Sequence, residues 1–169
     1  MPRSGEPRLK ISIVIPALNE AERIAGQVEA CLGLDPQPEV IVADGESSDG
    51  TVSKALRAGA RVVSCIRRGR AAQMNEAARI TQGDVLIFLH ADVRIAQRAY
   101  EALMRSMQDP DLLGGAFRRR FEPGSFLLDL GCRLAEYRGK WLRIFLGDQA
   151  IFVRREAFRK IGGDRKSVV

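Results

Sequence analysis

Three side chains able to bind a metal ion or a polar ligand directly follow apolar runs of strand length. Asp44 comes after the run 40–43, and His90 and Asp92 come after the run 85–89. A carboxylate just past a buried strand can hold a divalent ion with one or two protein ligands, which leaves the other positions for water and substrate phosphate. Asp92 fits this chemistry, with His90 as a second ligand. Asp44 could accept hydrogen bonds from a nucleobase or a ribose.

Each of these residues also has a structural interpretation, which stays open. Asp92 is placed to cap the segment that follows it, because a carboxylate accepts hydrogen bonds from the free N–H groups at a helix start. Asp44 and Gly45 form a common turn pair, and His90 could be a hydrogen-bonded group at a strand end. Only the agreement of several strand ends on one rim favours the functional interpretation.

A basic loop follows the third apolar run. Arg67, Arg68 and Arg70 surround Gly69 just after residues 61–65. Guanidinium groups bind phosphate oxygens through paired hydrogen bonds, so this loop could neutralise a diphosphate; the alternative is a solvated loop. No G-x-G-x-x-G follows the first apolar run and no G-x-x-x-x-G-K-[ST] occurs, which disfavours NAD- or FAD-binding proteins and P-loop NTPases.

The elements that must position these groups alternate between strand and helix. Asn19 stands where a helix cap is expected, Pro16 ends the first strand, and the apolar run 85–89 suggests burial on both faces, as in a parallel sheet. We therefore expect a doubly wound α/β fold, with ligands at the carboxyl ends of its strands. The predicted strands cover residues 11–15, 40–43, 61–65, 85–89 and 112–121, and the predicted helices cover 19–33, 50–58, 71–81, 96–107 and 126–145.

Composition indicates one globular domain. The chain has 169 residues, 46% of them hydrophobic, with 27 Lys and Arg against 21 Asp and Glu. We expect the domain to span residues 10–163, after a flexible N-terminus over 1–9 and before an atypical tail over 164–169. Three widely spaced cysteines fit neither a disulfide framework nor a zinc site, so a reducing cytoplasm is the expected compartment.

Charge is concentrated in the last third of the sequence. Residues 113–169 carry 13 basic and 6 acidic side chains, a net charge of +7, whereas residues 1–112 carry 14 and 15. Such a segment could face anionic lipid, a phosphate-bearing substrate or nucleic acid, or be a solvated surface. Nucleic acid is disfavoured, because the basic stretches lack interleaved aromatic residues and aromatics make up only 6% of the chain.

Several motifs, taken in order, resemble those of family 2 glycosyltransferases with the GT-A fold. The similar stretches are residues 16–21, 42–51, 69–75 and 88–92. Residues 115–118 and 147–155 further resemble the bacterial subfamily associated with radical-SAM and selenium-related proteins. Together these motifs cover about residues 11–163. The resemblance implies a Rossmann-like, mostly parallel sheet flanked by helices.

The resemblance also implies a reaction: transfer of a sugar from a UDP- or GDP-type donor to an acceptor hydroxyl, with inversion and with Mg²⁺ or Mn²⁺. Asp92 matches the last acid of the family's Asp-x-Asp metal motif, and His90 takes the place of the first. Gln149 would lie on the acceptor side and Asp148 would act as a substitute base. The positions that would bind the nucleotide sugar are Pro16, Ala17, Asn19, Glu20, Asp44, Arg70, Gln73, Asn75 and Ala91.

The end of the sequence departs from the family pattern. After Ile161-Gly162-Gly163 the family continues into an acidic Glu-Asp pair at a helix start, but this chain reads Asp164-Arg165-Lys166-Ser167-Val168-Val169. We therefore expect a truncated or frameshifted chain whose C-terminal part is incomplete. Nucleotide binding should survive with weak or no transfer. The alternative is a noncatalytic nucleotide-sugar-binding or interaction module.

Partners follow from the same features. The net charge of +7 over residues 113–169 suits a lipid-linked acceptor and peripheral contact with the inner face of the membrane. The predicted helix over 126–145 carries an apolar stripe, which favours a core-facing helix over a membrane-surface one. Apolar surface exposed by truncation would also favour a homodimer.

Overall fold

A computed structural model describes residues 9–66, 69–117 and 150–164 of the chain. Its strands are β1 (Ile11–Ala17), β2 (Glu39–Asp44), β3 (Arg61–Ser64), β4 (Val85–Phe88), β5 (Gly114–Ala116) and β6 (Ile151–Arg154). Its helices are α1 (Ile24–Leu32), α2 (Thr51–Arg57), α3 (Arg70–Ile80), α4 (Gln97–Ser106) and α6 (Arg155–Lys160). In the described residues no helix is long and apolar enough to cross a membrane.

The strands form one sheet in the order β3-β2-β1-β4-β6-β5. Strands β1 to β4 are parallel to one another, and β6 runs antiparallel to both β4 and β5. The chain moves outward from β1 to β3 and then returns to place β4 on the other side of β1. The switch point of the sheet therefore lies between β1 and β4, where ligands bind in open α/β sheets.

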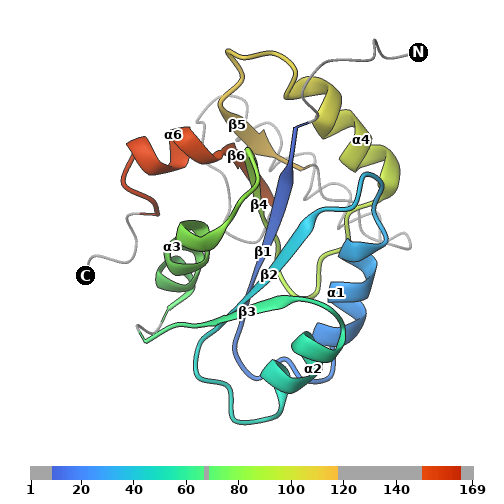
Figure 1. The fold of residues 1–169 in the computed structure, drawn as a ribbon, viewed down its shortest axis with the longest axis vertical. Helices are drawn as coiled ribbons and strands as arrows, with labels where there is room; N and C mark the ends of the chain where they lie inside the picture. The colour runs from blue at the N-terminus through green and yellow to red at the C-terminus, as the bar shows by residue number, and fades with distance from the viewer. Residues whose placement is uncertain (1–8, 67–68, 118–149, 165–169) are drawn as a thin grey trace, which may run out of the picture.

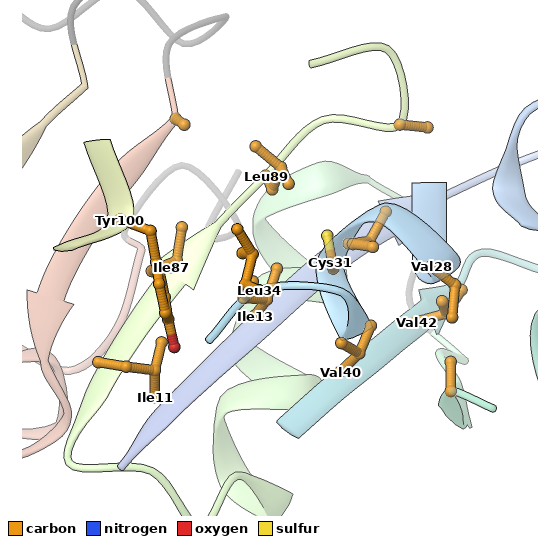
Figure 2. Close-up of a cluster of buried hydrophobic side chains, with 14 of the residues drawn as sticks. Ile11, Ile13, Val28, Cys31, Leu34, Val40, Val42, Ile87, Leu89 and Tyr100 are labelled. Atoms are coloured by element: carbon orange, nitrogen blue, oxygen red, sulfur yellow. The ribbon is translucent and has the colours of Figure 1, made fainter. Parts of the chain in front are cut away.

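Helices cover both faces of the sheet, with α1, α2 and α4 on one side and α3 and α6 on the other (Figure 1). Alternate residues of β1 supply the two cores. Ile13 packs with Val28 and Cys31 of α1 on the first face (Figure 2). Val14 packs on the second face with Met74 of α3 and Phe158 of α6. Burial on both faces confirms the expected doubly wound, mostly parallel α/β fold.

The sequence predicted that the first strand ends at Pro16, but β1 continues to Ala17. The strand can continue because the N–H that proline lacks would form no hydrogen bond with a neighbouring strand here. The Ala17 carbonyl accepts from Gly45 on the β2 side, and the Val14 carbonyl accepts from Leu89 on the β4 side. Since successive residues face opposite neighbours, the Pro16 nitrogen faces β4. Pairing with β4 has already ended at Val14 and Phe88.

Other predictions differ from the structure at element ends. The first helix begins at Ile24 rather than at Asn19, whose positive φ of 55° places it in a turn. Of the strand predicted over 112–121, the structure describes residues 112–117, and these form a strand over 114–116. Neither β6 nor α6 was predicted. The helix predicted over 126–145 lies outside the described residues.

Candidate functional site

A cleft of about 530 Å³ opens at the carboxyl ends of the parallel strands. The loops from β1 to α1 and from β2 to α2, at the lower edge of the sheet in Figure 1, form part of its wall. The structure brings three of the predicted binding residues to this cleft, namely Asn19, Arg70 and Gln73. Its other lining residues are Leu18, Gly45, Glu46, Ser48 and Gly69.

Asp44 lies at the end of β2, beside this cleft, and is only 3% exposed. Its Oδ2 accepts hydrogen bonds from the N–H groups of Glu46 and Ser47, both at 3.1 Å. Its Oδ1 is buried and has no hydrogen-bond partner among the described residues. A buried acceptor without a donor carries an uncompensated desolvation cost. Asp44 is therefore prepared to accept one more hydrogen bond from a donor group of a ligand.

The two loops beside Asp44 are joined by side-chain hydrogen bonds. The Asn19 N–H donates to Ser47 Oγ at 2.9 Å, and the Ser48 N–H donates back to Asn19 Oδ1 at 2.9 Å. The Glu20 N–H donates to Thr51 Oγ1 at 2.9 Å. The first loop is thus held in place before any ligand binds, and the side-chain oxygen of Asn19 is occupied by the bond from Ser48.

Asp49, in the loop between β2 and α2, also joins the two loops. It accepts a hydrogen bond from the Thr51 hydroxyl at 2.5 Å and another from the Ala21 N–H at 3.0 Å. These bonds hold the pKa of Asp49 below its ordinary value. Asp49 therefore remains a carboxylate near neutral pH and continues to accept both bonds.

Gln73 enters the site from α3 and is 6% exposed. Its Nε2 donates to the carbonyl oxygens of Ala17 at 2.8 Å and of Ala43 at 3.1 Å. These carbonyls belong to the carboxyl ends of β1 and β2, which are neighbours in the sheet. Ala17 is buried, so its predicted contact with a ligand would involve its main chain, whereas Pro16 is half-buried. Gln73 thus joins β1 and β2 at the end of their pairing.

The histidine and aspartate after β4 lie close together. His90 Nδ1 is 2.8 Å from Asp92 Oδ1, and their side chains are 39% and 57% exposed. Within the described part of the chain, His90 Nδ1 makes no hydrogen bond of normal geometry. Two ligands at right angles on an octahedral ion with bonds of about 2.1 Å would lie about 3 Å apart. The two side chains therefore fit a divalent ion that takes its other ligands from phosphate and water.

The described residues contain no cluster of three or more His, Cys, Asp or Glu side chains around one metal position. A two-ligand site is typical of magnesium-type ions bound together with a phosphate-bearing substrate. Ala91, predicted to contact the nucleotide sugar, lies in sequence between His90 and Asp92 and is buried at 3% exposure.

Other predicted site residues lie elsewhere. Asn75 does not line the cleft; it bonds to the main chain of Asp164 beyond α6. Asp148 and Gln149 lie outside the described residues. The roles predicted for all of these positions stay predictions.

Gln27 of α1 was not among the residues predicted from the sequence. Its Nε2 donates to the Val93 carbonyl at 2.6 Å and lies 3.4 Å from the His90 carbonyl. Ser47 and Thr51 were likewise not predicted as acceptors for the first loop. The sequence signal for Gln27 was a polar residue at the buried face of a helix, between Ile24 and Val28.

The sequence is similar to a known family of proteins and to several of its members. The sequence profile described as glycosyl transferase family 2 matches residues 12–162. The 4,4'-diaponeurosporenoate glycosyltransferase of Staphylococcus haemolyticus is 32% identical over 112 residues, which are 62% of this chain and 30% of the relative. Glucosyl-3-phosphoglycerate synthase of Mycobacterium tuberculosis is 33% identical over 93 residues, which are 49% of this chain and 29% of the relative.

Solved structures show the same fold. A mannosyltransferase from Pyrobaculum calidifontis in complex with GDP-Man and Mn²⁺ has a TM-score of 0.74 and 26% identity, covering 96% of this chain and 49% of that one. Glucosyl-3-phosphoglycerate synthase of Mycobacterium tuberculosis in complex with Mn²⁺, UDP and glucosyl-3-phosphoglycerate has a TM-score of 0.62 and 25% identity, covering 88% and 57%. This chain thus spans about half the length of these structures and less than a third of the curated relatives.

Proposed function

Because this chain belongs to glycosyl transferase family 2, we propose that it binds a nucleotide-diphosphate sugar and transfers the sugar to an acceptor hydroxyl with inversion. The observation that carries the proposal is the buried Asp44 Oδ1, an acceptor without a donor among the described residues at the edge of the cleft. The N–H and O–H groups of a nucleoside are donors of the required kind. The solved relatives with GDP-Man and with UDP support this class of ligand.

The proposed donor site extends from Asp44 toward α3. Arg70 is the first residue of α3 and lines the cleft, so its guanidinium can pair with the diphosphate. The positions proposed to contact the nucleotide sugar remain those predicted from the sequence. For Gln73 the described hydrogen bonds favour action on the main chain around the site, whereas those of Asn75 go to the main chain of Asp164, away from the cleft.

His90 and Asp92 are the residues that would hold Mg²⁺ or Mn²⁺. When bound, such an ion offsets the negative charge that builds up on the departing diphosphate. The complexes of two relatives with Mn²⁺ support divalent metal use.

In the proposed reaction the acceptor oxygen attacks the anomeric carbon, and the bond from that carbon to the diphosphate oxygen breaks. The acceptor proton passes to a carboxylate base, for which we propose Asp148, with Gln149 beside the acceptor. The nucleoside diphosphate leaves with the bonding electrons. A single displacement of this kind inverts the anomeric centre.

We also propose domain bounds, a subfamily and a class of acceptor for this chain. Residues 10–163 would form the transferase domain, of the subfamily associated with radical-SAM and selenium-related proteins. The net charge of +7 over residues 113–169 supports an anionic acceptor, a lipid-linked one included, at the inner face of the membrane.

The test is a calorimetric titration of the chain with UDP and with GDP, with and without Mn²⁺. Asp44→Asn should raise the Kd at least about tenfold, because it removes a charged acceptor from a buried hydrogen bond. Asp92→Asn should abolish the effect of Mn²⁺ on nucleotide affinity. Asp111→Asn, a change at an exposed position away from the cleft, is the matched control.

Two results would count against the proposal: no binding of either nucleotide, or equal affinities for Asp44→Asn and Asp111→Asn. Donor turnover is measured separately as transfer to added acceptors and as slow hydrolysis of the nucleotide sugar. Binding without either reaction would favour a noncatalytic nucleotide-sugar-binding module.

A further inference from the structure

Two glutamines are buried beneath the candidate site, and they come from opposite faces of the sheet. Gln27 of α1 is 3% exposed and Gln73 of α3 is 6% exposed. The two helices lie on different sides of the sheet (Figure 1). Burying an amide in an apolar interior costs free energy unless its donors find acceptors. The acceptors of Gln73 are main-chain carbonyls at the carboxyl ends of β1 and β2, and those of Gln27 are main-chain carbonyls in the turn after β4.

Gln73 holds the half of the site that contains Asp44. Its Nε2 donates to the carbonyls of Ala17 and Ala43, and the Ala17 carbonyl also accepts the Gly45 N–H at 2.9 Å. The residue before Asp44 is therefore bonded to this amide directly, and the residue after it is bonded to a carbonyl that the amide also contacts. A Cβ at Gly45 would lie 2.6 Å from Gln73 Nε2, so the loop passes directly over the amide.

Gln27 holds the half of the site that contains Asp92. Its Nε2 donates to the Val93 carbonyl at 2.6 Å and reaches toward the His90 carbonyl at 3.4 Å. The Val93 N–H donates to the same His90 carbonyl at 3.1 Å, which closes the turn. One side chain thus contacts both ends of the turn that carries the two proposed metal ligands.

The two sets of contacts share no residue. Within the described part of the chain, Gln73 bonds through its side chain to the ends of β1 and β2, whereas Gln27 bonds to the turn after β4. Residues without shared partners contribute nearly independently to stability and binding. Each glutamine should therefore affect its own half of the site and leave the other half unchanged.

We propose that Gln27 and Gln73 are positioning residues for separate halves of the site. Gln73 holds Asp44 and the loop after it in the geometry that binds the nucleotide, and Gln27 holds His90 and Asp92 in the geometry that binds the divalent ion. The proposal rests on the proposed function for its ligands. The positioning itself can be measured without any ligand.

The experiment compares Gln27→Met and Gln73→Met, each of which keeps a long unbranched side chain and removes the amide. Amide hydrogen exchange is measured by NMR at Gly45, Glu46 and Ser47 for one half, and at Val93 for the other. Mn²⁺ affinity is measured by electron paramagnetic resonance, and UDP and GDP affinity by calorimetry.

We expect Gln73→Met to speed exchange at Gly45, Glu46 and Ser47 at least about fivefold, the effect of losing one buried hydrogen bond. It should weaken nucleotide binding and leave exchange at Val93 unchanged. Gln27→Met should speed exchange at Val93 and weaken Mn²⁺ binding about tenfold, as for other residues that orient metal ligands. Each variant is the matched control for the other.

The proposal is overturned if either variant changes both halves equally, or if neither changes exchange in its own half. A variant that loses protection throughout the sheet is unfolded, and Q27A and Q73A then replace the methionine pair. If the wild-type chain binds neither nucleotide nor Mn²⁺, the proposed function fails. The exchange data still decide the positioning role in that case.

Discussion

Asn75 of α3 and Asp164 beyond α6 form a closed pair of hydrogen bonds across 89 residues of sequence. Asn75 Nδ2 donates to the Asp164 carbonyl at 3.0 Å, and the Asp164 N–H donates to Asn75 Oδ1 at 2.8 Å. Gly163 has a φ of 81°, and a Cβ there would lie 2.4 Å from Asn75 Oδ1. The chain that leaves α6 is therefore attached to the same helix that supplies Gln73 to the site.

Asn75→Ala should lower the free energy of unfolding by about 1–3 kcal/mol, because it removes two hydrogen bonds to the main chain of Asp164. Urea unfolding followed by circular dichroism measures this. Glu76→Ala, at the next position, removes an exposed pair with Arg79 and should change stability by less than about 1 kcal/mol. Equal effects of the two variants would show that the hydrogen-bonded pair contributes little.

Gly45→Ala should destabilise the protein by about 1–3 kcal/mol, because the new Cβ meets a buried amide that two carbonyls hold in place. It should also weaken nucleotide binding. In the double variant Gly45→Ala/Gln73→Ala the amide that clashes with the new Cβ is gone. Its loss of unfolding free energy should therefore be smaller than the sum of the losses in the two single variants, as a double-mutant cycle measures.

Gly26→Ala is the matched control for this change. Gly26 lies inside α1, and a methyl group added there would have Arg94 Nη2 as its nearest neighbour, at 3.8 Å. Alanine should therefore stabilise the helix by about 0.5–1 kcal/mol. Destabilisation by Gly26→Ala as large as that of Gly45→Ala would contradict the steric explanation.

The parallel part of the sheet was predictable because its signal is local. The run of residues 85–89 is apolar throughout, and Val85–Leu89 are all buried. Strand β6 could not be predicted in the same way. Its four residues are only half-buried, and it forms a strand by pairing with β4 and β5, which are distant in sequence. The antiparallel edge therefore depends on long-range pairing rather than on a sequence pattern.

The site likewise contains residues that the sequence could predict and residues that it could not. Asp44 and Asp92 could be proposed because the carboxyl ends of parallel strands meet at one edge of the sheet. The role of Gln27 could not, because a polar residue on the buried face of α1 does not tell which group it bonds to, and its acceptor at Val93 is 66 residues away. The left-handed conformation of Asn19 likewise depends on Ser47 and Ser48 in the next loop.

The thiols of Cys31 and Cys65 should be unreactive in the folded protein. Burial raises the pKa of Cys31 to about 12, against the opposing charge of Arg94. Burial, together with the charges of Glu76 and Asp44, raises the pKa of Cys65 to about 11. Because the thiolate is the nucleophile, only about one Cys65 in a thousand is reactive at pH 8.

Peptide mass spectrometry after iodoacetamide treatment at pH 8 checks this prediction. Both cysteines should be labelled slowly in the native protein and rapidly in urea. Native labelling of Cys65 as fast as in urea would show that the end of β3, next to the cleft, opens readily. Cys132 lies outside the described residues and is mapped as a separate peptide.

Glu39 organises the opposite end of the sheet from the site. Its Oε2 accepts from the Ser12 hydroxyl at 2.5 Å and from the Gln82 N–H at 2.9 Å, and Arg61 pairs with its Oε1. The Ser12 hydroxyl in turn accepts the Gly83 N–H at 2.8 Å. One carboxylate thus joins β1, β2, β3 and the segment before β4.

Glu39→Gln should therefore destabilise the protein by about 1–3 kcal/mol near neutral pH. Burial acts to raise the pKa of Glu39, but the bonds from Gln82, Ser12 and Arg61 outweigh it and hold the pKa below its ordinary value. Because the folded-state pKa is depressed, the contribution is complete above the unfolded value of about 4.3. It is lost as the pH falls through the folded-state pKa. Urea midpoints of wild type and variant should therefore converge in acid, whereas a gap that is independent of pH would indicate lost packing rather than lost charge.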